Sequence, residues 1–149
     1  MLDDRLAIDF GTSNSAAAIL HDGRPRRIAI EPGAETLPTA VFFPAQCGAM
    51  RIGAAAAEAL VQGAEGRYMR ALKSVLGTAL FHESRLIAGK RRTLCDIVAA
   101  FLATLRERAE AAAGRRFRRA LSGRPVHFHS NDPARDAQAE ADLRGCYLA

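Results

Sequence analysis

The segment DFGTSNS, residues 9–15, has the residue types and spacing of a phosphate-binding turn between two apolar runs. A carboxylate such as Asp9 at the end of a strand can hold a magnesium ion through the waters of that ion. The residues that follow offer backbone N–H groups and three hydroxyls to a phosphate. Gly11 lets the backbone approach a ligand closely. This segment is therefore the first candidate for chemistry.

The same residues also fit a plain hairpin connection, which is a Gly-led turn of this length. The chain contains no Gly-x-x-x-x-Gly-Lys-Ser/Thr loop. A helix follows a loop of that kind, whereas a strand pattern follows this turn. The residues alone leave both interpretations open.

Strands must flank this turn. Arg5–Phe10 and Ser15–His21 are short apolar runs of strand length, and Asp22-Gly23 is a hairpin signal that leads to a third strand at about Arg27–Ile30. The sequence therefore predicts a three-stranded antiparallel meander. Two further short strands are predicted at residues 39–44 and 50–52.

Helices are predicted from residue 54 onward. Two Ala-containing segments, 54–62 and 67–76, each end at a glycine. The clearest helix is Leu94–Ala113, because its apolar residues recur at i, i+3, i+4 and i+7. Thr93 is its expected N-cap, and Gly114 stands where a left-handed residue ends a helix.

The last part of the chain is predicted to contain two strands and a helix. The strands, 120–123 and 126–128, lie on either side of Arg124-Pro125. The helix begins after Asp132, with Pro133 at its first position. His127 and His129 are too few for a zinc site, so a structural or surface role is expected for them.

Composition excludes several classes of protein. The 149 residues fit one domain, and 49% hydrophobic with 25% charged residues excludes disorder. Three widely spaced cysteines without a Cys-x-x-Cys favour neither a disulfide framework nor a zinc site and suit a reducing cytoplasm. No signal-peptide pattern is present, and the apolar stretch Ile97–Leu105 is too short for a membrane span. A cytoplasmic location is therefore expected.

The net charge of +5 is concentrated in one segment. Residues 85–124 carry 11 basic and 3 acidic side chains. Such a segment can attract a phosphate backbone, although a solvated helix surface is the favoured interpretation. The segment has few aromatic residues and no recognisable helix-turn-helix, which disfavours nucleic-acid binding.

Five segments, in order, resemble those of the actin-like ATPases and particularly the DnaK-like heat-shock chaperones, the seventy-kilodalton heat-shock family. The segments are DFGTSNS, TLPTAVFF, RIGAAAAEAL, RALKSVLG and SGRPVHFHSNDPARDAQ. The variants around Lys73 and Pro125 look most like the YegD-like branch. The resemblance implies an α/β fold, namely a ribonuclease-H-like, actin-like ATPase lobe. It would comprise a mixed sheet that starts with the meander and a smaller inserted α/β subdomain.

The resemblance also implies a role for individual residues. Asp9 matches the family's catalytic, magnesium-associated carboxylate, and residues Gly11, Thr12, Ser13 and Asn14 match its phosphate loop. Lys73 matches the catalytic lysine that orients the γ-phosphate and the attacking water. Pro125 and Arg135 match residues implicated in nucleotide-linked switching. The implied ligands are ATP or ADP with magnesium.

Lys73 is one of only two lysines among 21 basic residues. A lysine ammonium is a mobile point charge that the fixed guanidinium fork of arginine does not replace. The composition therefore agrees with a specific role for Lys73.

The 149 residues lack the family's second phosphate loop, Asp-x-Gly-Gly-Gly-Thr, and its adenosine pocket. The chain is therefore expected to be a partial ATPase domain. The expected parts are first-subdomain strands with the phosphate loop (1–33), an inserted subdomain with helices (34–114), and a return strand with the start of a helix (115–149). By itself this fragment is expected to bind ATP weakly or not at all and to be inactive.

The expected function is that of a fragment of an ATP-hydrolysing, DnaK-like molecular chaperone. Its expected partners are nucleotide and, through regions outside this sequence, client polypeptides and co-chaperones. The open sheet edge of a partial domain predicts self-association. Two alternatives stay open: a stand-alone interaction module that binds nucleic acid through its basic segment, and a fragment of another actin-like ATPase or kinase.

Overall fold

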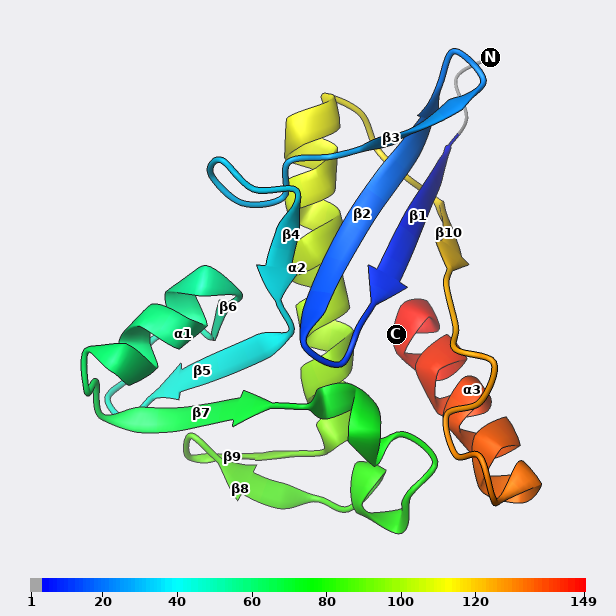
Figure 1. The fold of residues 1–149 in the computed structure, drawn as a ribbon. Coiled ribbons are helices and arrows are strands. Elements are labelled where there is room, and N and C mark those ends of the chain that lie inside the picture. The colour runs from blue at the N-terminus through cyan, green and yellow to red at the C-terminus, as the bar shows by residue number, and fades with distance from the viewer. Residues whose placement is uncertain (1–3) are drawn as a thin grey trace.

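A computed structural model describes residues 4–149, and its main sheet begins with the first strands of the chain (Figure 1). β1 (Arg5–Phe10), β2 (Asn14–His21) and β3 (Arg24–Arg27) form an antiparallel meander. The sheet order is β10-β1-β2-β3, with β10 (Arg119–Ser122) parallel to β1. β4 (Thr36–Pro38) pairs with the first residues of β2. The predicted meander is confirmed.

The third strand starts earlier than the sequence predicts. Asp22 and Gly23 both have positive φ angles, 50° and 73°, so the hairpin turn contains only two residues and Arg24 pairs with His21. Of the expected strand at about Arg27–Ile30, only Arg27 lies in the ladder, opposite Ala18, and the N–H of Ile28 still donates to the carbonyl of Ala17 at 2.9 Å. The apolar side chains of this segment, Ile28 and Ile30, are buried in the core all the same.

A second sheet forms around β5 (Ala40–Pro44), which pairs with both β6 (Arg51–Ile52) and β7 (Gly66–Arg70). α1 (Ala54–Val61) packs on β5 through its buried alanines, Ala56 and Ala59. The predicted strands at 39–44 and 50–52 and the helix at 54–62 are confirmed to within a residue or two.

The helix predicted at 67–76 is wrong. Residues 66–70 form β7, and the next turn is a short 3-10 helix, η1 (Leu72–Val75). β7 pairs residue by residue with β5, from Ala40 opposite Arg70 to Pro44 opposite Gly66. These bonds come from a strand more than twenty residues away, and they override the local helical pattern.

The chain then passes through a short 3-10 helix, η2 (Ala79–Phe81), and a small hairpin. β8 (Arg85–Ile87) and β9 (Lys90–Arg92) pair antiparallel, with Ala88 and Gly89 at positive φ in the turn. This hairpin leads directly into the longest helix.

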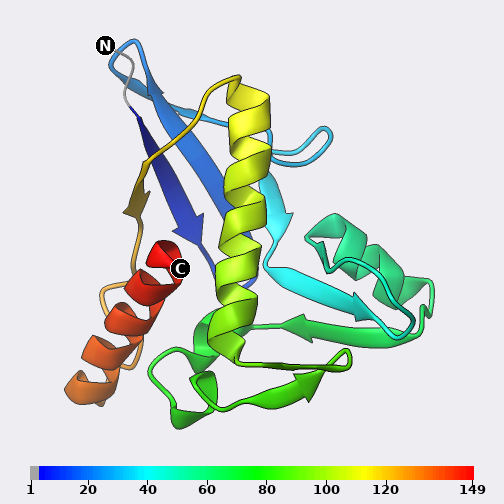
Figure 2. The ribbon, with the colours of Figure 1, turned by 180° about the vertical axis from the view of Figure 1, so that it is seen from behind.

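α2 (Leu94–Ala113) covers one face of the main sheet, lying behind β1 and β2 in Figure 1 and in front of them in Figure 2. Its start and end are as predicted: Thr93 and Asp96 form a capping box, and Gly114 is left-handed. Its apolar stripe is buried against alternate residues of β1, and the rings of Phe10 and Phe101 lie 5.8 Å apart.

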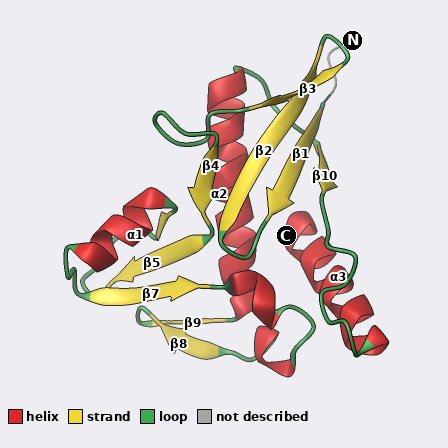
Figure 3. Ribbon diagram, viewed as in Figure 1, coloured by secondary structure: helices red, strands yellow, loops and turns green. Residues whose placement is uncertain are grey.

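α3 (Pro133–Leu148) packs beside α2 and is capped by Asp132, as predicted (Figure 3). The strand predicted at 126–128 is not formed. The Asp136 carboxylate accepts hydrogen bonds from the N–H groups of Phe128 and His129, so these groups are not available to a neighbouring strand.

No helix in the described part, residues 4–149, has the length and apolar character needed to cross a membrane. The chain is thus a mixed α/β fold in which α2 and α3 flank the main sheet and the second sheet extends to one side (Figure 3).

Candidate functional site

The turn between β1 and β2 is closed too tightly for any residue but glycine at position 11. A Cβ built on Gly11 would overlap the carbonyl oxygen of Asn14. Thr12, Ser13 and Asn14 are exposed at the tip of the hairpin. Glycine at position 11 therefore lets the turn close against the Asn14 carbonyl, and the three residues that follow it are exposed to solvent.

Two contacts fix this turn to the start of β5. The N–H of Thr39 donates to the carbonyl of Ser13 at 2.9 Å. The hydroxyls of Ser15 and Thr39 are hydrogen-bonded at 2.7 Å, and both side chains are buried. Because a buried hydroxyl pair is costly to separate, these contacts hold the turn in one place.

Asp9 lies on the face of the sheet opposite α2. Leu6, Ile8 and Phe10 of β1 are buried toward the core, so the alternation of the strand turns Asp9 outward, where it is exposed. The residues around it are small: Ala16 is its partner on β2, and Gly123 lies close to its carboxylate. Together with larger residues that include Arg27 and Leu121, they line a hollow of about 700 Å³.

An exposed carboxylate beside small side chains leaves room for a metal ion that keeps its own waters. Magnesium prefers such binding through one or two carboxylates. The residues around Asp9 therefore fit a hydrated magnesium ion, and the exposed turn residues Thr12, Ser13 and Asn14 offer N–H and hydroxyl donors to a phosphate group.

Tyr147 of α3 reaches toward this part of the sheet. Its hydroxyl accepts a hydrogen bond from Ser122 at 3.1 Å. Burial and the nearby negative charge of Asp9 raise the pKa of Tyr147 to about 12, against the opposing effect of the Ser122 bond. Tyr147 therefore stays neutral in the physiological range.

Lys73 lies in η1, three residues after β7 ends. Arg70, the last residue of β7, pairs with Ala40, and Thr39 beside it bonds Ser13 of the turn. We call residues 71–77, which follow β7, the Lys73 segment. The turn and the Lys73 segment therefore both adjoin the junction of the two sheets at Thr39 and Ala40. The Lys73 ammonium lies 5.8 Å from the centre of the Phe128 ring.

The backbone before Lys73 is strained. Ala71 has a φ of 56° and a ψ of 33°, the left-handed conformation that alanine rarely adopts. Such strain costs roughly 1 kcal/mol or more and persists only where the surroundings enforce it. The surroundings therefore hold η1 in place.

The residues that follow η1 are held by α3 and by the segment before it. The carboxylate of Asp142 accepts hydrogen bonds, each 2.8 Å, from the N–H of Gly77 and the side chains of His82 and Gln138. His129 donates to the carbonyl of Leu76 at 2.8 Å. We call these contacts the α3 clamp, meaning Asp142 and His129 on residues 76–82. His129 thus has the structural role that the sequence favours.

Asp142 is ionised within this clamp although its side chain is only 2% exposed. Burial alone would raise the pKa of its carboxyl, but the bonds from Gln138, His82 and Gly77 outweigh that effect and lower the pKa. A buried carboxylate with three donors is a rigid anchor, so the clamp fixes residues 76–82 to α3.

Pro125 and Arg135, the predicted switch residues, flank this clamp. Pro125 is half-buried in the segment after β10, and Arg135 is exposed in the first turn of α3. The carbonyl oxygen of Arg135 lies so close to Gly77 that a Cβ there would overlap it. The structure brings the backbone of Arg135 to the Lys73 side of the molecule.

Asp136 ties the Pro125 segment to α3. It pairs with Arg124 at 3.2 Å and accepts the N–H groups of Phe128 and His129. Desolvation opposes ionisation of this carboxyl, but those N–H groups and the charge of Arg124 lower its pKa overall.

Sequence reasoning missed Asp142, Asp136 and Thr39. One sequence signal was available for Asp142 and Asp136. Acidic residues occur on different faces of the predicted last helix, so not all of them can be equally exposed once the helix packs against the rest of the protein. Their partners, however, are defined only by the fold.

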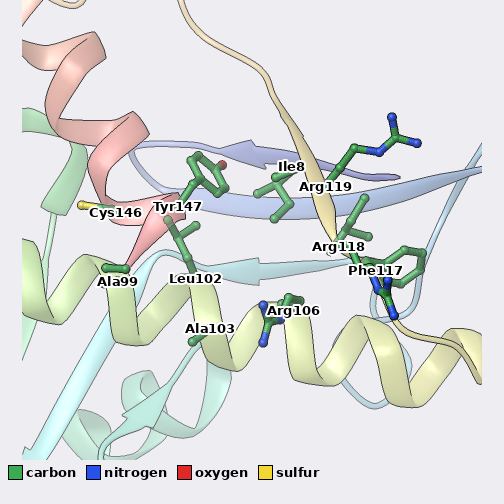
Figure 4. Close-up of a pocket in the computed structure, with 13 residues that line it drawn as sticks. Ile8, Ala99, Leu102, Ala103, Arg106, Phe117, Arg118, Arg119, Cys146 and Tyr147 are labelled. Atoms are coloured by element: carbon green, nitrogen blue, oxygen red, sulfur yellow. The ribbon is translucent and has the colours of Figure 1, made fainter. Parts of the chain in front are cut away.

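The cavity in Figure 4 lies elsewhere, between α2, the start of the return strand and the end of α3. Its volume is about 140 Å³. Ligand sites have roughly 300–1,000 Å³. Its wall combines apolar side chains such as Ile8, Leu102 and Phe117 with Arg106. This cavity is too small to be the nucleotide site.

The basic segment does not form one patch. Lys90–Arg92 precede α2 and Arg115–Arg119 follow it. A 20-residue helix is about 30 Å long, so the two groups stand at its opposite ends. Arg92 lies over the ring of Phe43, and Arg119 pairs with Asp4.

The chain is similar to known proteins. The family model described as "Hsp70 protein" matches residues 5–87. A relative named "Chaperone protein DnaK", from Methanothermobacter thermautotrophicus, is 34% identical over 130 residues, which is 85% of this chain and 21% of the relative. The chain thus spans about a fifth of the length of this relative.

Proposed function

The chain belongs to the Hsp70 family, and from this premise we propose that it forms part of the ATPase domain of a DnaK-like chaperone. In this proposal the first phosphate loop is Gly11–Asn14, the magnesium-associated carboxylate is Asp9 and the catalytic lysine is Lys73. The observation that supports it most is the shared junction at Thr39 and Ala40, from which both the turn and the Lys73 segment start.

The proposed chemistry is phosphoryl transfer to water. Such transfer depends mainly on positioning and on stabilising negative charge. The N–H groups of the turn would hold phosphate oxygens, and the Lys73 ammonium would orient the terminal phosphate and the attacking water. A bound magnesium ion neutralises phosphate charge, and Asp9 would hold it through water.

Finer assignments follow from the same proposal. The sheet order β10-β1-β2-β3, with β10 parallel to β1, supports a ribonuclease-H-like lobe. The divisions 1–33, 34–114 and 115–149 stay predictions, and residues 1–3 of the first range lie outside the described residues. The YegD-like branch is supported by the variants around Lys73 and Pro125, and the switch roles of Pro125 and Arg135 are part of the proposal.

Client polypeptides and co-chaperones are proposed partners of the whole protein, in the cytoplasm. Nucleic acid is disfavoured, because the basic residues stand at opposite ends of α2. Salt-sensitive DNA affinity at low ionic strength would revive that alternative.

Self-association through β10 is a further expectation. Among the strands of residues 4–149, β10 is at one edge of the sheet, and Leu121 and Val126 nearby are 63% and 84% exposed. Open apolar edges pair with other copies. Light scattering should find dimers or larger assemblies, and a monomer at all concentrations would contradict this.

Amide NMR of the chain with Mg-ATP tests the proposed site. We expect shifts of the Thr12, Ser13 and Asn14 amides with millimolar affinity, because the chain carries only one side of the proposed cleft. Asp9→Asn should abolish the difference between Mg-ATP and ATP with a chelator. Asp22→Asn, at a carboxylate 91% exposed in a turn, should leave it intact.

Unchanged turn amides at saturating Mg-ATP, or shifts confined to Arg115–Arg119 and independent of magnesium, would refute the proposed phosphate site.

A further inference from the structure

Two cysteine side chains meet where α2 and α3 pack together. The Sγ atoms of Cys95 and Cys146 are 3.7 Å apart. Cys95 is in the first turn of α2 and half-buried, whereas Cys146 is near the end of α3 and 3% exposed. The third cysteine, Cys47, is exposed in the loop after β5. Two thiols far apart in sequence are therefore already in contact.

We propose that Cys95 and Cys146 are an oxidisable pair, a modification site at which a disulfide joins α3 to α2. A disulfide bond is about 2.05 Å long. Closing the remaining gap requires rotation of the two side chains and a small approach of the helices. The inference does not depend on nucleotide binding, so it goes beyond the proposed function.

The two thiols differ in accessibility and in their surroundings, and these differences determine which of them reacts first with an oxidant. Cys95 is the more accessible one, because it is half-buried whereas Cys146 is only 3% exposed, so an oxidant in solution reaches Cys95 first. Burial, together with Cys95 and the carboxylates of Asp142 and Asp96, raises the pKa of the Cys146 thiol. Cys95 is therefore the thiol that attacks an oxidant, and Cys146 is the resolving thiol.

The reaction with a small-molecule disulfide is balanced as follows. The Cys95 thiolate attacks one sulfur, the S–S bond of the small molecule breaks, and one thiolate leaves. Cys146 gives its proton to that thiolate and attacks Sγ of Cys95, which releases the second thiolate; this takes up the proton that Cys95 had lost to solvent. The protein loses two electrons and two protons, and the small disulfide becomes two thiols.

Oxidation would also strengthen the α3 clamp. Asp142 and Cys146 are four residues apart on α3, so both project from the same face of the helix. A covalent bond at Cys146 would limit movement of that face and thereby of the Asp142 bond to Gly77. Disulfide formation is thus expected to restrain the Lys73 segment.

Oxidation by glutathione disulfide tests the proposal. The whole chain, and the chain with Cys47→Ser, is equilibrated at increasing ratios of oxidised to reduced glutathione, and free thiols are then blocked with N-ethylmaleimide. Non-reducing peptide mapping is expected to find Cys95 linked to Cys146. The melting temperature should rise by roughly 5–10 °C on oxidation and return on reduction.

Cys95→Ser and Cys95→Ala are the matched variants. Both change a half-buried residue, and neither should form the linked peptide nor gain melting temperature under oxidant. Full blocking of both thiols at every ratio would overturn the proposal. So would glutathione attached to Cys95 with Cys146 still free, because Cys146 would then fail to resolve the mixed disulfide.

A second readout reports on the clamp. Hydrogen exchange of the Gly77 amide is expected to slow at least severalfold on oxidation of the Cys47→Ser chain and to be unaffected in Cys95→Ser. Unchanged exchange in a chain with the mapped disulfide would overturn the link to the Lys73 segment. None of these readouts uses nucleotide, so failure here and failure of the proposed ATP site are distinguishable.

Discussion

The two halves of the candidate site are held by different means. The β1–β2 turn is shaped by its own residues, because Gly11 closes against Asn14, three positions further on. The Lys73 segment is held by His129 and Asp142, bonded to residues 53 and 65 positions earlier. The shape of the turn is thus local, although Thr39 fixes its position, whereas the Lys73 segment depends on distant residues. Mutations should therefore affect the two halves in different ways.

The largest effect is expected for Gly11→Ala. The new Cβ would overlap a backbone carbonyl that cannot move without opening the hairpin, so unfolding should become easier by roughly 3 kcal/mol. Chemical denaturation measures this change. Gly145→Ala in α3, where a Cβ meets nothing within 4 Å, is the control and should stabilise by about 0.5–1 kcal/mol. If Gly11→Ala had the same free energy of unfolding as the wild type, the turn would not be closed against the Asn14 carbonyl as described.

Asp142→Asn should loosen the Lys73 segment, which the α3 clamp holds, and leave the β1–β2 turn unchanged. The side-chain amide of asparagine cannot accept three hydrogen bonds, and its NH2 group would face the donors of the clamp. The free energy of unfolding should therefore fall by about 2 kcal/mol. Hydrogen exchange should accelerate at Gly77 and not at Ala17, whose partners lie within the meander. Asp22→Asn is the matched exposed control. Equal acceleration at both amides would show that the two halves are not independent.

Acid should weaken the clamp before it affects the turn. The folded pKa of Asp142 is lowered from its ordinary value of 3.8, so its contribution to stability is complete above that value. It is lost as the pH falls through the lower, folded pKa. Between pH 5 and pH 3, denaturation curves of the wild type should lose more free energy than those of Asp142→Asn. Parallel losses in both proteins would contradict an ionised Asp142.

Lys73→Ala should have the smallest effect on stability. The contact with the Phe128 ring contributes about 0.5–1 kcal/mol at a partly exposed site. Lys90→Ala, at the other lysine of the chain, is the control and should change little. Denaturation midpoints compare the two. A loss of several kcal/mol in Lys73→Ala would make Lys73 a structural residue and weaken its proposed catalytic role.

Much of the fold follows from sequence wherever the signal is local. The hairpin at Asp22-Gly23, the N-cap at Thr93 and the end of α2 at Gly114 are all formed by residues a few positions apart, and the sequence predicts all three. The helix predicted at 67–76 failed because β7 takes its hydrogen bonds from β5. The strand predicted at 126–128 failed because Asp136 binds its N–H groups.

The same distinction applies to the candidate site. Asp9, the Gly11 turn and Lys73 were found from residue types, order and resemblance. Asp142 was not, because a carboxylate in a polar helix looks like any exposed one until its donors are known. The contact between Cys95 and Cys146 was likewise invisible, since their separation of 51 residues carries no signal.

The sequence by itself determined the turn, the caps and the family to which the chain belongs. These depend on short-range sterics and on motifs that survive in linear order. Only the tertiary structure decided the conformation of the backbone that carries Lys73. A short 3-10 turn with a strained Ala71 has little stability of its own, and the residues directly after it, Leu76 and Gly77, are held by His129 and by Asp142 of α3.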